Sequence, residues 1–151
     1  ADRFTGLGRL ASSQGHGWVM AANETEIFLV NAETGQLTDR QRLGRLAGTA
    51  PIIMSQLVTY ASGDLVVGHS LGTKGQAWAY RFPSAVKTDP IWTGGTTACF
   101  VSTDGSVGIL DCDAGSIVGT GKMFDTAGAT PTVGDGAVFI ASMDQSLWAF
   151  D

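Results

Sequence analysis

The sequence predicts an all-β protein, a β-propeller whose four-stranded antiparallel blades each take about 40 residues. Glycine supplies 21 of the 151 residues, about twice its average share, which indicates many tight turns between short strands. Gly35, Gly75 and Gly115 recur at a constant step of about 40 residues, and no helical periodicity accompanies them. This pattern favours propeller blades over a β-solenoid, whose coils are usually shorter and lack hairpin turns.

Other positions keep the same step. The pair Gly35-Gln36 matches Gly75-Gln76. A large apolar residue and an acidic turn residue each recur once in every unit. These two series are Met20, Tyr60, Phe100 and Ile140, and Glu24, Asp64, Asp104 and Asp144.

Each unit is predicted to contain four strands. The first begins at a proline, as in APIIM at 50–54, where a missing N–H donor is tolerated. The second and third form a hairpin, clearest in AVFIAS and SLWAF at 137–150. Counting back from its turn places Phe139 opposite Phe150 and Ala141 opposite Trp148. A glycine turn then leads into the fourth strand, expected at 36–42, 77–82 and 116–120.

The repeat divides one domain, 1–151, into a closing strand, three blades and an incomplete three-stranded blade. LGRLA at 7–11 echoes LGRLA at 43–47, which follows a fourth strand, so the residues before it are expected to act as a fourth strand. Three arrangements satisfy this: a four-bladed ring, a homodimer closing an eight-bladed ring, or a fragment of a seven- or eight-bladed ring. The absence of an initiator Met favours a cut piece or a half-ring. The expected bounds are 1–6 for the strand, 7–46, 47–86 and 87–126 for the blades, and 127–151 for the incomplete blade.

The composition limits the kinds of partner that we expect. A net charge of −5 argues against nucleic acid and against an anionic membrane surface. No stretch approaches the roughly 20 apolar residues of a membrane-spanning helix, so membrane insertion is not expected. An isolated half-propeller would expose apolar blade faces beyond the few hundred Å² usual for a monomer, so we expect association through blade faces.

A longer motif carries a family resemblance. The runs TPTVGDGAVFIASMDQSLWAFD at 130–151 and NAETGQL at 31–37 resemble the repeat of PQQ-like, quinoprotein-type β-propellers. The resemblance implies the propeller fold and a periplasmic or other extracytoplasmic location in bacteria. It implies no particular activity, because such repeats occur in enzymes, scaffolds and sensor domains. The match is good over 98–115 and 129–151, fair over 18–37 and partial over 47–82.

The same family places a docking tryptophan in the fourth strand, a few residues beyond a Thr-Gly. Here only Trp78 has a comparable place. We therefore expect blade docking to be less regular, with Trp18, Trp92 and Trp148 packing from other strands.

Few residues suggest catalysis, metal binding or a disulfide. Cys99 and Cys112 are read as two separately buried small hydrophobes, with a cross-strand disulfide as the alternative. His69 falls in an apolar register and is expected to be structural, and His16 stands alone. The acidic series is read as turn residues rather than a ring of cation sites. No catalytic residue and no metal ligand is assigned.

The leading functional hypothesis is a non-enzymatic binding or scaffold module that contacts other proteins through its loops and needs no cofactor. Under the family resemblance it would be similar to propeller lipoproteins of outer-membrane assembly, or to propeller domains attached to bacterial enzymes and kinases. The alternative is a fragment of a PQQ-dependent dehydrogenase or related propeller enzyme, which would use PQQ and calcium with its active site in other blades.

Overall fold

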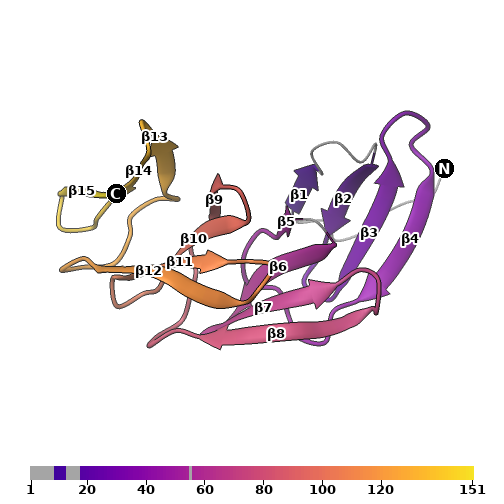
Figure 1. The fold of residues 1–151 in the computed structure, drawn as a ribbon, viewed down its shortest axis with the longest axis horizontal. Helices are drawn as coiled ribbons and strands as arrows, with labels where there is room; N and C mark the ends of the chain where they lie inside the picture. The colour runs from indigo at the N-terminus through magenta and orange to yellow at the C-terminus, as the bar shows by residue number, and fades with distance from the viewer. Residues whose placement is uncertain (1–8, 13–17, 55) are drawn as a thin grey trace.

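The computed structural model describes residues 9–12, 18–54 and 56–151, and these residues form fifteen strands and no helix (Figure 1). The strands make four antiparallel sheets, three with four strands and the last with three. The expected closing strand at 1–6 and His16 lie outside the described residues. Nothing in the described part is a helix that could span a membrane.

Strands lie in chain order within every sheet, as expected for propeller blades. Sheet 1 comprises β1 (Arg9–Ser12), β2 (Trp18–Ala22), β3 (Glu26–Asn31) and β4 (Leu37–Arg42). Sheet 2 comprises β5 (Ile52–Met54), β6 (Leu57–Ser62), β7 (Leu65–Ser70) and β8 (Gly75–Arg81). Sheet 3 comprises β9 (Ile91–Gly94), β10 (Thr97–Val101), β11 (Ser106–Asp111) and β12 (Ser116–Lys122). Sheet 4 comprises β13 (Thr132–Gly134), β14 (Ala137–Ala141) and β15 (Leu147–Phe150).

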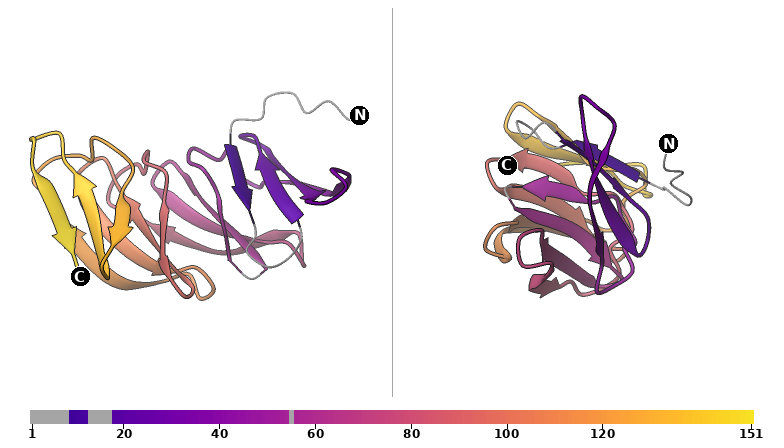
Figure 2. Two further views of the ribbon diagram at one scale, coloured as in Figure 1. Left: turned by 90° about the horizontal axis from the view of Figure 1, so that it is seen from above. Right: turned by 90° about the vertical axis from the view of Figure 1, so that its right-hand side faces the viewer.

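The four sheets stand side by side along an open arc (Figures 1 and 2). The first strands of neighbouring sheets meet, with β1 contacting β5 and β9 contacting β13. Sheets 1 and 4 stand at opposite ends of the arc (Figure 1). The described part of the chain therefore does not close a four-bladed ring on itself.

The glycine turns before the fourth strands are alike in sheets 1 and 3 and different in sheet 2. Gly35 and Gly115 take φ +69° and +68°, and the side chains of Asn31 and Asp111 accept backbone N–H groups of these turns. Sheet 2 has Leu71 in place of that acceptor. Its turn forms one residue earlier, with Lys74 rather than Gly75 at positive φ.

The hairpin of sheet 4 shows how loop length sets strand register. Ser142 donates its backbone N–H to the Ser146 carbonyl (2.9 Å) across a three-residue loop in which Gln145 takes φ +66°. The expected pairing of Phe139 with Phe150 requires an even number of loop residues, and it is wrong by one position. The observed pairs are Val138–Phe150, Phe139–Ala149, Ile140–Trp148 and Ala141–Leu147.

This one-residue difference matters because side chains alternate between the two faces of a strand. Trp148 and Phe150, which were expected to share a face with Phe139, instead lie on the other face. Packed against sheet 3 are Val138, Ile140, Trp148 and Phe150. The opposite face carries Phe139, Ala141, Leu147 and Ala149.

A hydrophobic cluster fills each of the three gaps between neighbouring sheets. Each large side chain fully buried in such a gap contributes about 1.5–3 kcal/mol to stability. The centres of the clusters are Met20, Ile27, Val58 and Tyr60 between sheets 1 and 2; Val66, Phe82, Phe100 and Leu110 between sheets 2 and 3; and Val101, Val107, Met123 and Ile140 between sheets 3 and 4.

Trp78, on β8, connects sheet 2 to sheet 3. Its indole Nε1 donates to the Cys112 carbonyl oxygen (2.9 Å). A Cβ added at Gly115 would lie 2.4 Å from the indole ring, so the ring packs directly on the glycine backbone. Trp78 therefore docks one blade on the next, as the resemblance implied for that strand.

The remaining tryptophans differ in their packing. Trp148 stacks with Phe150 (ring centroids 6.2 Å apart) against the core between sheets 3 and 4, as expected. Trp92 is 49% exposed and donates its Nε1 to the Gly95 carbonyl of its own loop, so its expected packing role is wrong. The side chain of Trp18 lies outside the described part.

Candidate interaction surface

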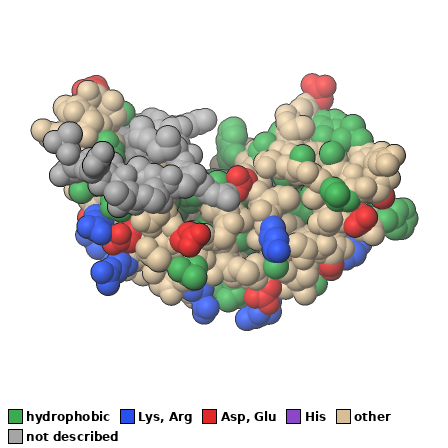
Figure 3. Space-filling view, turned by 180° about the vertical axis from the view of Figure 1, so that it is seen from behind, with side chains coloured by type: hydrophobic (Ala, Val, Ile, Leu, Met, Phe, Trp, Pro, Cys, Tyr) green, Lys and Arg blue, Asp and Glu red, His purple; other side chains and the backbone are tan. Residues whose placement is uncertain are grey.

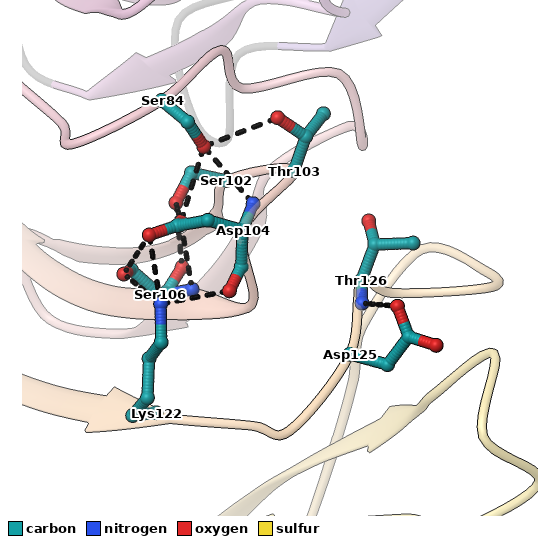
Figure 4. A network of polar contacts seen from close by, with 8 residues as sticks. All are labelled: Ser84, Ser102, Thr103, Asp104, Ser106, Lys122, Asp125 and Thr126. Carbon is teal, nitrogen blue, oxygen red and sulfur yellow. Dashed lines mark hydrogen bonds and ion pairs between the residues drawn. The ribbon is translucent and has the colours of Figure 1, made fainter.

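Asp104, in the turn between β10 and β11, holds together a polar network (Figure 4). Its Oδ1 accepts from the Ser102 hydroxyl (2.6 Å) and the Ser106 backbone N–H (3.2 Å), and its Oδ2 accepts from the Lys122 ammonium (2.7 Å). Ser84 Oγ, from the connection between sheets 2 and 3, lies 3.1 Å from Asp104 Oδ1. The Lys122 ammonium and then the Ser102 hydroxyl hold the pKa of Asp104 well below its usual range.

The other acidic residues of the series make different contacts. Asp144 repeats the turn bond, accepting the Ser146 N–H at 3.0 Å. Asp64 forms an ion pair with Arg81, and Glu24 uses its backbone carbonyl. Asp104 and Asp144 thus confirm the interpretation as turn residues. Within the described residues, no three His, Cys, Asp or Glu side chains gather as a metal site would require.

His69 is a structural residue between sheets 1 and 2, as predicted. It is 2% exposed, and its Nε2 lies 3.2 Å from the Gln41 side-chain oxygen. Gln41 is itself buried on β4 and donates to the Leu71 carbonyl (3.1 Å). Burial lowers the pKa of His69.

Cys99 and Cys112 are free thiols on opposite faces of sheet 3. Cys99 packs toward sheet 4 and Cys112 toward sheet 2, and burial raises their pKa values to about 12 and about 11. The interpretation as separately buried hydrophobes is confirmed, and the disulfide alternative is wrong. Cys99 lies opposite Ile109, three residues before Cys112 on the same strand run, so the two sulfur atoms lie on opposite faces of sheet 3 and face away from each other.

Dehydrogenases of the family that the sequence resembles commonly carry a disulfide between adjacent cysteines. Cys99 and Cys112 are instead separated by the thickness of sheet 3. Several of the described carboxylates belong to turns or to surface ion pairs such as Arg40–Glu26 and Lys74–Asp39.

Sheet 4 carries a group of exposed apolar side chains. Phe124, in the connection from β12, is 91% exposed and meets the Trp148 ring edge-on (centroids 5.3 Å apart). Met143 is 62% exposed, and its backbone N–H donates to the Thr126 carbonyl (3.0 Å) beside that connection. Figure 3 shows hydrophobic side chains gathered at this end of the molecule, at the right of that view.

The outer edge of sheet 4 is open as well. β15 pairs with β14 on one side and, within the described residues, with no strand on the other. In sheets 1 to 3 a fourth strand covers that edge. The indole Nε1 of Trp148, on β15, is buried without a hydrogen-bond partner among the described residues. We define the sheet 4 surface as the free edge of β15 together with Phe124, Met143 and Trp148.

At the other end of the arc, the outer face of sheet 1 combines apolar and charged groups. Phe28 and Val30 alternate with the residues that face sheet 2, and Leu37, opposite Val30, is 38% exposed. The Arg40 guanidinium lies over the Phe28 ring at 5.4 Å. Arg40 also donates to Glu26 (2.7 Å) and lowers the pKa of that carboxyl.

Comparison with known proteins is informative for the fold. No protein-family model and no curated protein matches the chain. Solved structures match it well: BamB from Moraxella catarrhalis has a TM-score of 0.74 at 20% identity over 91% of this chain. The computationally designed Ika4 protein has a TM-score of 0.76 at 17% identity over 99%, and the designed Ika8 protein 0.72 at 17% over 95%.

These neighbours are β-propellers. The fold is a β-propeller. The chain covers 44% of BamB and 45% of Ika8, so it spans less than half of those chains, whereas it covers 92% of Ika4. At these identities the likeness shows the fold alone and does not establish membership of the PQQ-like family.

Sequence reasoning did not find the sheet 4 surface. Phe124 follows a buried methionine, Met123, directly after a fourth strand. The apolar pair was a usable signal, because consecutive residues of an extended segment point in opposite directions and only one of them can be buried.

Proposed function

We propose that this chain is a non-enzymatic protein-binding module and that a partner protein binds it at the sheet 4 surface. The observation that carries the proposal is Phe124, 91% exposed beside a sheet whose outer edge has no paired strand. Large aromatic side chains exposed to water are characteristic of interface hot spots.

The arrangement suits a partner that adds a β-strand. A strand laid along β15 would hydrogen-bond with its free backbone groups. Such a strand would pass beside Trp148 and Phe124, which could bury its apolar side chains.

The negative charge of the sheet 4 surface favours a partner strand that has basic residues at its ends. Asp125 and Asp144 lie next to Phe124 and Met143 in the chain, and residues 123–151 contain no Lys or Arg. Hydrogen bonds from Ser146 lower the pKa of Asp144, so this carboxylate is ionised at neutral pH. Lysines or arginines flanking an apolar strand would complement this surface.

A site-specific photo-crosslink tests the proposal. Benzoylphenylalanine in place of Phe124, in the full chain produced in its native cells, should give a discrete protein adduct after irradiation. The same group in place of Glu33, an exposed turn residue of sheet 1, is the matched control and should give none. Adding Met143→Ser, a change at a 62% exposed side chain, should weaken the adduct several-fold. Equal adducts at positions 124 and 33, or none at 124, would overturn the proposal.

The likeness of the sequence to PQQ-like repeats supports an extracytoplasmic location for this module. Two buried, unbridged cysteines are compatible with either side of a membrane, so they do not oppose it.

A further inference from the structure

The fourth strands of sheets 1, 2 and 3 end in the same two-residue pattern. In each sheet the last residue of the fourth strand is basic, and the next residue of the chain is large and apolar. We call these two residues the strand-end pair. The three pairs are Arg42-Leu43, Arg81-Phe82 and Lys122-Met123.

The basic member of each strand-end pair forms an ion pair with an acidic residue at or beside the turn between the second and third strands. The partners are Arg42 with Glu26, Arg81 with Asp64, and Lys122 with Asp104. The contact in sheet 3 is the most extensive (Figure 4). The Lys122 ammonium donates to the Asp104 carboxylate and backbone carbonyl, both at 2.7 Å, and to Ser106 Oγ at 3.1 Å.

The apolar member packs into the gap between its own sheet and the next one. Phe82 and Met123 are 4% and 1% exposed, and Leu43 is partly buried. The cluster around each of them also contains an apolar residue near the start of the third strand, at most 3% exposed. These covered residues are Ile27, Val66 and Val107.

Sheet 4 has the receiving half of this arrangement. Its turn, Ser-Met-Asp-Gln-Ser at 142–146, matches Ser-Thr-Asp-Gly-Ser at 102–106 in sheet 3, with the same 2.9 Å backbone bond between the two serines. Asp144 accepts the Ser146 N–H as Asp104 accepts that of Ser106. Yet Asp144 has no ion pair within the described residues. Leu147 occupies the position of the covered third-strand residues and is 71% exposed.

We infer that a partner protein completes sheet 4 with a strand that ends in a strand-end pair, a Lys or Arg followed directly by a large apolar residue. The basic side chain binds Asp144, and the apolar side chain covers Leu147. The strand runs antiparallel to β15, as the fourth strands of the other sheets run antiparallel to the third. This deepens the proposed function, and rests on it, because it specifies the partner segment that pairs with β15.

The strand-end pair selects the register of the added strand. Backbone hydrogen bonds along the free edge of β15 supply affinity for an extended segment of almost any sequence. In sheet 3, Lys122 lies opposite Ser106, so the basic residue of the partner lies opposite Ser146. A slip of one residue would turn the basic side chain onto the face of Leu147, because side chains alternate between the two faces of a strand.

A peptide with the sequence of residues 75–82, which is β8 together with Phe82, is a suitable first probe. Labelled with fluorescein, it should bind the full chain in an anisotropy titration. The matched control is the same peptide with its last two residues, Arg and Phe, exchanged, which should bind several-fold more weakly at equal composition and charge. Equal binding of the two peptides, or no binding of either, would overturn the inference.

Variants of the full chain then test the ion pair. Asp144→Asn removes the charge but keeps an acceptor for the Ser146 N–H, so the turn can persist. It should weaken binding of the probe several-fold, and it should not affect a probe that carries Arg81→Gln. Asp135→Asn, in the other turn of sheet 4, is the matched control and should bind like the unaltered chain. Independent, additive losses from Asp144→Asn and Arg81→Gln would contradict the pairing.

The photo-crosslink at Phe124 separates this inference from the proposed function. Mass spectrometry of the adduct should locate the crosslink in a partner segment that contains a Lys or Arg followed by a large apolar residue. An adduct in a segment without that pair would keep the proposed function and reject the strand-end pair. Absence of any adduct would reject the proposed function, whatever the peptides do.

Discussion

Gly35 and Gly115 show how one residue position can have two different energetic roles. Both follow a third strand and take nearly the same positive φ, +69° and +68°. An added Cβ at Gly35 would meet nothing within 4 Å, whereas at Gly115 it would lie 2.4 Å from the Trp78 ring. The backbone requirement is thus shared by the repeat, and the packing requirement is specific to the interface of sheets 2 and 3.

This difference leads to a matched pair of substitutions. Gly35→Ala should lower the free energy of unfolding by about 1–2 kcal/mol, the cost of a left-handed conformation for a residue with a Cβ. Gly115→Ala should lose a further amount of about 1–3 kcal/mol, because the methyl group displaces the indole. Urea denaturation of both variants measures the two losses. Equal losses would show that Trp78 moves away at no cost.

At the scale of elements, loop length decided which residues face each core. The three-residue loop between β14 and β15 placed Phe139 and Ala141 on the uncovered face. The equivalent loop at Asp104 separated Cys99 from Cys112. A change of one loop residue reverses every side chain along the following strand, so errors of register affect whole faces.

The contact between β4 and β7 predicts a pH dependence. His69 is buried against Gln41, and desolvation lowers its pKa from the usual 6.5. Between that lowered pKa and 6.5 the unfolded chain binds more protons than the folded chain, so the free energy of unfolding falls as the pH falls below about 6.5. The neighbouring Asp39 stays ionised in this range, because hydrogen bonds, first from the Gln41 side chain, lower the pKa of this carboxyl.

The variant His69→Gln removes this titration while keeping a polar side chain. Urea unfolding of both proteins from about pH 7 to pH 5 should show a shallower decline for the variant. Parallel declines would mean that His69 is not the group responsible.

At the scale of the whole molecule, the open arc governs what the chain can do. Three interfaces between sheets are filled, and sheet 4 stands at one end of the arc with no paired strand on the outer edge of β15 in the described structure (Figures 1 and 2). The proposed binding at the sheet 4 surface depends on this open end.

A thermal unfolding experiment on the whole chain distinguishes a binding module from part of a quinoprotein enzyme. PQQ together with Ca²⁺ should leave the thermal unfolding temperature of the full chain unchanged, because a ligand stabilises a protein only when the folded state binds it. Differential scanning calorimetry with Ca²⁺ alone is the control. A rise that requires PQQ and grows with its concentration would favour the enzyme alternative.

The repeat, the strands and the all-β architecture could be predicted from the sequence, because they depend on local chemistry. Glycines at turns, prolines at strand starts and alternating apolar residues act over a few positions and recur every blade. His69 could be assigned to packing for the same reason, since its register holds apolar residues in the other units, Leu29, Ile109 and Ala149. In sheet 2, Leu71 replaces the Asn or Asp that accepts the turn N–H groups in sheets 1 and 3. The turn before its fourth strand accordingly forms one residue earlier.

The functional surface could not be predicted in this way, because exposure depends on which sheets have neighbours. Leu147 and Val67 are both apolar strand residues, yet one is 71% exposed and the other 1%. Only the tertiary arrangement decides this, since a sheet face is buried by another sheet distant in sequence. The local chemistry of this chain determined its blades, and the three-dimensional course of the arc determined which of their faces remain for a partner.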